Sequence, residues 1–213
     1  MIRLLKAGLF RLKKDILFWI FIFLTIGLAI LTLVRYVPIE GITLDSALNE
    51  FLIYIGLFIA IFVSIFVGKE HSQGIIRNKI IVGHSRFSIF LANLIICIIV
   101  SLLCELIYLA IIFLVGTPLL GQLQMTLSQF IGILENTIFI IISFCSIYNF
   151  VTMLCSEITI STTICIILFI AMFIAQGAFS LTAHSSKYIE NAFYDENGNK
   201  HIISQEIDPN YPG

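Results

Sequence analysis

Residues 16–34 read ILFWIFIFLTIGLAILTLV and contain no charged side chain. A helix needs about 20 consecutive apolar residues to cross the hydrocarbon core of a bilayer, and this run has roughly that length. Lipid offers the backbone no hydrogen-bond partners, so a crossing segment must satisfy its own amide groups as an α-helix. We therefore predict a transmembrane helix at this place.

Four more apolar runs follow along the chain, at residues 51–68, 89–115, 130–154 and 158–179. The run 89–115 is longer than a crossing requires, so we expect it to tilt or to project beyond the membrane. The predicted fold class is all-α, a polytopic helical membrane protein with five transmembrane helices. Its transmembrane domain covers residues 16–181, and an extracytoplasmic loop covers residues 182–213.

The composition favours the same class. Hydrophobic residues make up 59% of the 213 residues and charged residues 12%, whereas a soluble chain carries about 25% charged residues. Twelve basic and thirteen acidic residues give a net charge of -1, so the charge balance gives no indication of nucleic-acid binding. All five cysteines lie within or beside apolar runs, so we expect them to pack as apolar side chains and form no disulfide framework.

Basic residues are distributed unevenly along the chain. Nine of the twelve lie within residues 3–14 and 69–86, while residues 36–50 and 116–129 contain none. Basic residues next to transmembrane helices are retained on the cytoplasmic side. This asymmetry predicts a cytoplasmic N-terminus, a cytoplasmic loop 69–86 and an extracytoplasmic tail.

Residues 1–15 have the pattern of an amphipathic helix. Basic residues lie off the apolar face, which is formed by Ile2, Leu5, Leu9, Leu12 and Ile16. Such a helix lies in the headgroup plane of the membrane, with its bases toward lipid phosphates. The alternative is that these bases only fix the topology of the chain.

The loop 69–86 is longer than a simple turn and predicts a short cytoplasmic helix. Ile76 and Ile80 share one face of that helix, with Arg77 and Lys79 offset from them. Gly83 is suited to the left-handed conformation that ends a helix, and Ser85 can cap the next one. Exposed aliphatic side chains on a rigid short helix suit docking into the groove of a partner. The alternative is a solvated basic loop.

One family resemblance rests on this loop. Its pattern is Glu-x3-Gly-x2-Arg-x-Lys-x3-Gly-x-Ser-Arg, formed by Glu70, Gly74, Arg77, Lys79, Gly83, Ser85 and Arg86. The pattern resembles the cytoplasmic signature of ABC-2 type ABC transporter permeases, as does the basic helix before the first transmembrane run. The Pro-Asn-Tyr-Pro stretch at residues 209–212 is also similar to that family.

The resemblance implies a coupling helix between Glu70 and Arg86 that seats on an ABC ATPase subunit. It also implies a second permease subunit, forming a homodimer or heterodimer in a bacterial plasma membrane. A permease of that family has six transmembrane helices, so we expect a sixth beyond Gly213. The chain has no Gly-x4-Gly-Lys-Ser/Thr phosphate loop. We therefore predict that it is not an enzyme, that ATP binds to the partner and that the chain itself needs no cofactor.

Four polar residues within the apolar runs are candidates for lining a substrate path: Glu105, Glu135, Asn149 and Gln176. Neither glutamate has a Lys or Arg nearby in its run, so each needs a hydrogen bond or a wet cavity. The alternative is that they join helices to one another. The four histidines are too dispersed in the sequence to form a metal site.

Two functions are compatible with these residues. The first is a permease subunit that exports an amphipathic substrate, such as a peptide, a drug or a lipid-linked molecule, driven by a separate ATPase. The second is a membrane protein that transports nothing and acts in immunity, sensing or assembly. A stable ATPase partner would distinguish the two.

Overall fold

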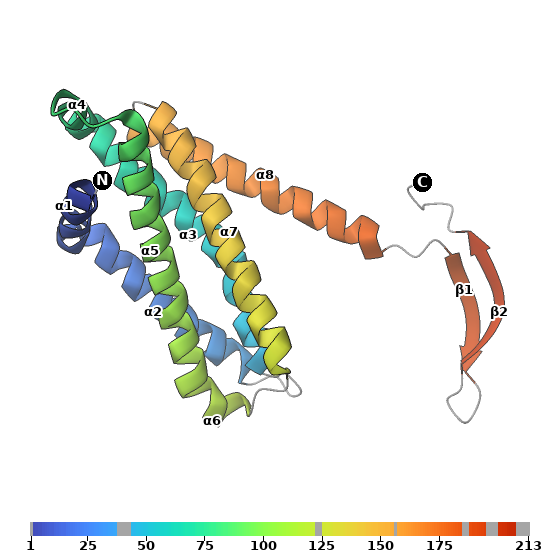
Figure 1. Cartoon of the computed structure of the whole chain (residues 1–213). Coiled ribbons are helices and arrows are strands. Elements are labelled where there is room, and N and C mark those ends of the chain that lie inside the picture. The colour runs from blue at the N-terminus through green and yellow to red at the C-terminus, as the bar shows by residue number, and fades with distance from the viewer. Residues whose placement is uncertain are drawn as a thin grey trace. The chain divides into compact units, whose positions relative to one another are not determined.

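The structure, a computed structural model, describes residues 2–37, 44–121, 125–155, 157–184, 188–194 and 200–207. The chain divides into two compact units, residues 1–169 and 170–213. The helices are α1 (Ile2–Lys14), α2 (Ile16–Tyr36), α3 (Leu44–Ser72), α4 (Ile75–Ile81), α5 (Arg86–Ile111), α6 (Thr117–Leu120), α7 (Leu127–Leu154) and α8 (Ile158–His184). A π-helical turn, η1 (Ile112–Gly116), joins α5 to α6, and the strands are β1 (Tyr188–Tyr194) and β2 (Lys200–Ile207) (Figure 1).

The predicted transmembrane helices are confirmed. Among the described residues, five helices are long and apolar enough to cross a membrane, and they coincide with the five apolar runs. The third continues from Arg86 through η1 to Leu120, a total of 35 residues. At 1.5 Å per residue it is about 50 Å long, well beyond the 30 Å hydrocarbon core, so it must tilt or project as predicted.

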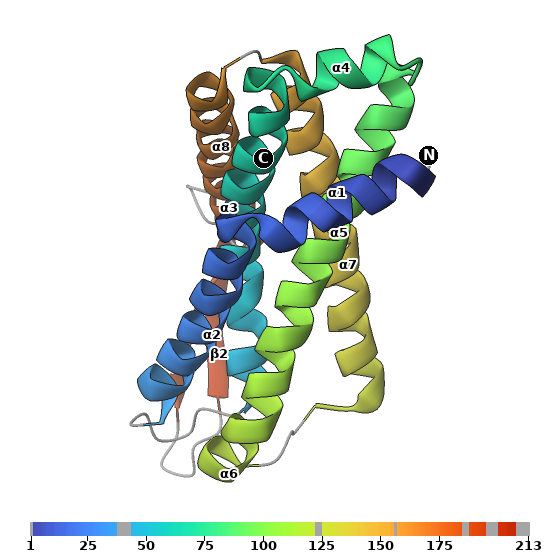
Figure 2. The same cartoon turned by 90° about the vertical axis from the view of Figure 1, so that its left-hand side faces the viewer.

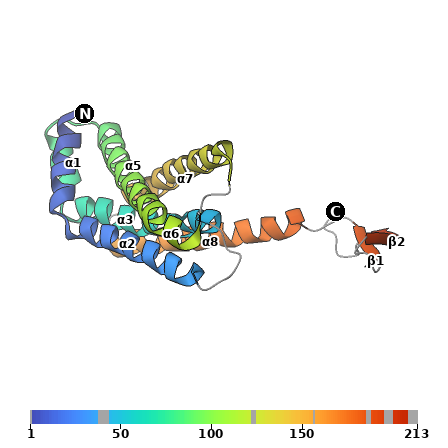
Figure 3. The same ribbon diagram turned by 90° about the horizontal axis from the view of Figure 1, so that it is seen from below.

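Helix α3 forms much of the core of the first unit. It packs against α2, α5 and α7 and lies alongside α2 in the view from below (Figure 3). Its buried apolar side chains recur at helical spacing and include Phe51, Ile55, Ile59 and Phe66. Phe51 stacks on Tyr108 of α5, with ring centroids 4.5 Å apart, and the Tyr108 hydroxyl donates to the Ala47 carbonyl at 2.8 Å.

Helix α1 is confirmed as a helix, but it packs on α5 rather than contacting headgroups alone (Figure 2). Its buried stripe is Leu4, Gly8 and Leu12. A methyl group at Gly8 would overlap the end of the Ile96 side chain of α5, so a larger residue there would require that side chain to shift. Ile16, predicted to lie on this face, instead opens α2 and is exposed, because Asp15 breaks the helix.

The second unit contains a feature that was not predicted. Strands β1 and β2 pair antiparallel, from Tyr188 opposite Ile207 to Tyr194 opposite Lys200. The register shifts between Asn191 and Ala192, where one residue of β2 is extra, as in a β-bulge. The tail predicted as a loop over 182–213 thus begins inside α8 and then contains a hairpin.

Candidate functional site

The loop 69–86 contains three parts: the last turn of α3, the short helix α4, and a cap for α5. Gly74 and Gly83 flank α4 with φ of 69° and 94°, a region that a side chain disfavours. The Gly83 and His84 amides donate to the carbonyls of Ile80 and Lys79. Ser85 caps α5 by accepting from the Ser88 amide at 3.2 Å. The predicted roles of Gly83 and Ser85 are confirmed.

Glu70 is the centre of a buried cluster of charged and polar groups. Its side chain is 2% exposed, and its Oε1 accepts from Arg11 Nη1 and Lys79 Nζ, each at 2.6 Å. Its Oε2 accepts from Asn93 Nδ2 at 2.7 Å. The four residues come from α3, α1, α4 and α5, so a single carboxylate connects four helices.

Arg11 has two further contacts that fix its position. Its Nη2 donates to the Phe66 carbonyl at 3.3 Å, and its guanidinium lies 4.2 Å from the centroid of the Phe66 ring. A second ion pair lies nearby in the sequence, where Lys69 Nζ contacts both Asp15 oxygens at 3.1 and 3.2 Å. Since Asp15 also accepts from the Leu17 amide as the N-cap of α2, the pair fixes the α1–α2 junction to the end of α3.

These contacts revise the predicted coupling element in two respects. Glu70 belongs to α3 and is buried, whereas the helix within the loop spans only Ile75–Ile81. Ile76 is half-buried and packs on the cluster of Leu4, Ile89 and Ala92, because α4 folds back toward α5.

The exposed aliphatic face of α4 is therefore displaced from the predicted one. Ile80 is 38% exposed, but Ile81 and Val82 are 73% and 77% exposed. Arg77 is exposed on the same helix. The predicted pair of Ile76 and Ile80 is thus replaced by Ile81 and Val82 as the side chains most available to a partner.

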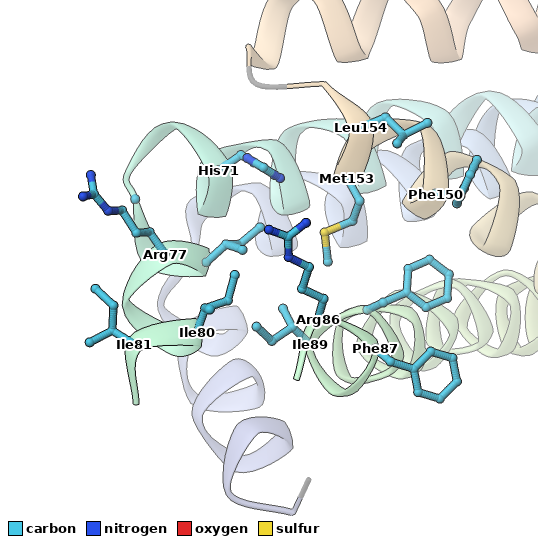
Figure 4. Close-up of a pocket in the computed structure, with 13 residues that line it drawn as sticks. His71, Arg77, Ile80, Ile81, Arg86, Phe87, Ile89, Phe150, Met153 and Leu154 are labelled. Carbon is cyan, nitrogen blue, oxygen red and sulfur yellow. The ribbon is translucent and has the colours of Figure 1, made fainter. Parts of the chain in front are cut away.

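A cleft of about 990 Å³ lies between α4, the start of α5 and the end of α7 (Figure 4). Its apolar lining includes Ile76, Phe87, Ile89, Phe150 and Met153. His71, Arg77 and Arg86 are its basic residues. Arg86 extends toward Met153, whereas Arg77 lies at the outer margin on α4 (Figure 4). Sequence reasoning missed this cleft, since its walls are far apart along the chain.

The predicted substrate-path residues are dispersed. Glu105 is buried in α5, and its Oε2 has no hydrogen-bond partner among the described residues. Asn149 is buried in α7 and donates to the Phe90 carbonyl of α5 at 3.1 Å, which favours a role in joining helices. Glu135 and Gln176 are exposed. No hydrogen bond joins any two of the four within the described parts of the chain.

One ion pair between the first two transmembrane helices was also missed. Arg35 Nη1 of α2 lies 2.8 Å from Glu50 Oε1 of α3, and the Tyr54 hydroxyl donates to the same oxygen at 3.3 Å. The available signal was Arg35 directly after the first apolar run and Glu50 directly before the second, although the segment between them holds two further acids. Within the described ranges, no group of three His, Cys, Asp or Glu side chains is placed to hold a metal ion.

The fold and this site define a multi-pass helical membrane protein with a short, charge-anchored helix at one end of its bundle. Comparison with protein-family models, curated proteins and solved structures finds no match for the chain.

Proposed function

We propose that this chain is the membrane-spanning subunit of an ABC-2 type transporter that exports an amphipathic substrate. The observation that supports this most directly is the attachment of α4. Lys79 of α4 pairs with Glu70 of α3 at 2.6 Å, while Ile81 and Val82 remain exposed. A short helix anchored on one side and apolar on the other suits a docking element.

The Glu70 cluster gives this proposal a mechanical basis. An ATPase subunit bound at Ile81 and Val82 would move α4, and Lys79 would transmit the displacement to Glu70. Through Arg11 and Asn93, the same carboxylate contacts α1 and α5. Motion of the ATPase would thus reach the ends of several helices at once, and ATP chemistry would stay on the partner.

The proposal is tested by co-purification with ABC ATPase subunits of the source cell. In Ile81→Asp, a charge replaces an anchor side chain whose burial contributes about 1.5–3 kcal/mol. We expect the variant to insert normally and to bind the ATPase about ten- to a hundredfold more weakly. Substrate-stimulated ATP hydrolysis should fall in parallel.

Leu119→Asp is the matched control, because Leu119 is an exposed aliphatic residue of α6, at the opposite end of the bundle from α4 (Figure 2). It should leave ATPase binding unchanged. Equal binding by the wild type and Ile81→Asp would remove α4 as the docking element. If the wild type binds no ATPase, the immunity, sensing or assembly function would be favoured instead.

A further inference from the structure

The cleft between α4, α5 and α7 combines an apolar wall with unpaired cations. Thirteen residues line it, and only His71, Arg77 and Arg86 are charged or titratable. None of the thirteen is acidic. Neither arginine forms an ion pair in the described part of the chain, and the acidic residue nearest the end of α7, Glu157, pairs with neither.

Three other bases at this end of the bundle differ from these two arginines. Arg11, Lys69 and Lys79 each pair with a buried or half-buried carboxylate. Those internal pairs use Glu70 and Asp15, so neither acid is available to Arg86. The free cationic charge at this end of the bundle is therefore concentrated at the cleft and on the surface of α1.

The position of the cleft at the ends of membrane-crossing helices favours a lipid over a soluble partner. Arg86 is the first residue of α5, and Leu154 is the last residue of α7. Both are ends of helices that can cross a membrane, and such helices pass the headgroups where they leave the hydrocarbon core. Phe150 of α7 is 56% exposed, so the apolar wall opens toward the acyl chains.

We propose that this cleft binds an anionic phospholipid, with Arg86 holding the phosphate and the phenylalanines of α5 and α7 contacting an acyl chain. Arg77 and His71 supply further positive potential at the margin. The volume of about 990 Å³ is at the upper end of the range for small-molecule sites. The lining has basic residues and no acid, so an anionic headgroup complements it better than the same basic cleft of a second copy.

The test uses the full chain in vesicles and a tryptophan reporter. The chain has one tryptophan, Trp19, which is replaced by phenylalanine, and Phe150→Trp then places the reporter in the cleft. Bromine on a lipid acyl chain quenches a tryptophan that it contacts. Vesicles contain brominated phosphatidylglycerol or, in parallel, brominated phosphatidylcholine at the same mole fraction.

We expect phosphatidylglycerol to associate about fivefold more strongly than phosphatidylcholine, the effect of about 1 kcal/mol for one base near a lipid surface. Arg86→Ala should reduce this ratio to about one, and Arg86→Lys should preserve most of it, as the charge remains. Arg77→Ala should have a smaller effect.

Two matched controls separate the cleft from its surroundings. Phe139 is 71% exposed on the same helix, three turns from Phe150 and on the same face, about 16 Å away. A reporter there should show no preference between the lipids. Replacing Lys6 and Lys13, two exposed bases of α1, with alanine should leave the preference at position 150 intact.

Three results would overturn the proposal. Equal quenching by the two lipids at position 150 would indicate unselective lipid contact. The absence of quenching there, with normal quenching at position 139, would show that protein covers the cleft. A preference that survives Arg86→Ala would refute the assigned anchor. None of these readouts depends on the ATPase, so the proposal stands or falls independently of the proposed function.

Discussion

Glu70 is a buried carboxylate that accepts hydrogen bonds from three side chains. It is nearly fully buried, yet each of its oxygens is hydrogen-bonded and two cations share one of them. Burial of a charge is costly unless partners replace its hydration, and removing one member of a buried pair costs about 3–5 kcal/mol. Removing any one charged member of the cluster should therefore destabilise the fold.

Glu70→Gln tests this dependence. The neutral amide leaves Arg11 and Lys79 close together without a counter-charge, and we expect a loss of about 3 kcal/mol, near the lower end of the range because both bases retain some exposure. Thermal unfolding can be followed by labelling of the buried cysteines, such as Cys97 and Cys165. Glu135→Gln, at an exposed position, is the control and should leave the unfolding temperature unchanged.

Glu105→Gln should behave in the opposite way. Glu105 is buried, and its Oε2 lacks a partner in the described structure, so a neutral side chain of the same size is easier to accommodate. We expect an unfolding temperature equal to or above that of the wild type, in the assay used for Glu70. A clear decrease would show that the carboxylate has a partner that stabilises it. Altered export with normal stability would support a place in the substrate path.

The orientation of helix α4 depends more on the turns at its two flanking glycines than on its own seven residues. A helix this short is unstable alone, so its orientation is set by the turns and by the Lys79–Glu70 pair. Gly83 takes φ of 94°, and a Cβ at this position would meet only open space. The cost of a side chain there is thus conformational and not steric.

Gly83→Ala should cost about 1–2 kcal/mol through the left-handed backbone, and it should increase hydrogen exchange in α4. Gly83→Asn should cost less, because asparagine tolerates this region better. Gly27, inside α2, also has open space around it, so Gly27→Ala should stabilise the chain by about 0.5–1 kcal/mol. Similar exchange rates in wild-type and Gly83→Ala α4 would contradict the assigned role of the turn.

Some features of the helices could be predicted from the sequence and others could not. The five transmembrane helices were predictable because hydropathy is a local property that needs no knowledge of neighbours. The exposed face of α4 could not be predicted, because seven residues make barely two turns. Their periodicity does not show whether Ile76 or Ile81 is exposed. The Glu70 cluster was also not predictable, because Arg11 and Asn93 lie 59 and 23 residues from Glu70 and meet it only after packing.

Most basic residues of the described helices lie at one end of the helical bundle, around α1, α4 and the start of α5. Helix α4 and the start of α5 lie at the end opposite α6 and the start of α7 (Figure 1). If basic residues are retained in the cytoplasm, Asn78 and Ser128 lie on opposite sides of the membrane. Both are exposed and suitable for labelling.

Engineered cysteines test this orientation. In intact cells, a membrane-impermeant maleimide should label Ser128→Cys and should reach Asn78→Cys only after permeabilisation. Labelling of both positions from outside would contradict the topology, and labelling of Asn78→Cys alone would reverse it. The parent chain, in which most cysteines are buried, reports the background.

The Glu70 cluster also imposes an order on the synthesis of the chain. Arg11 leaves the ribosome long before its counter-ion, which is 59 residues later, and Asn93 completes the set only within the third transmembrane helix. Until then α1 can form its polar contacts with α3, but its apolar stripe lacks α5, the helix on which it packs. We expect nascent chains arrested before α5 emerges to leave α1 open to protease, and chains arrested after α5 has inserted to protect it. Protection at the earlier arrest point would show that lipid and the contacts with α3 are enough to hold α1 in place. Protection only at the later point would show that α1 docks when α5 is synthesised.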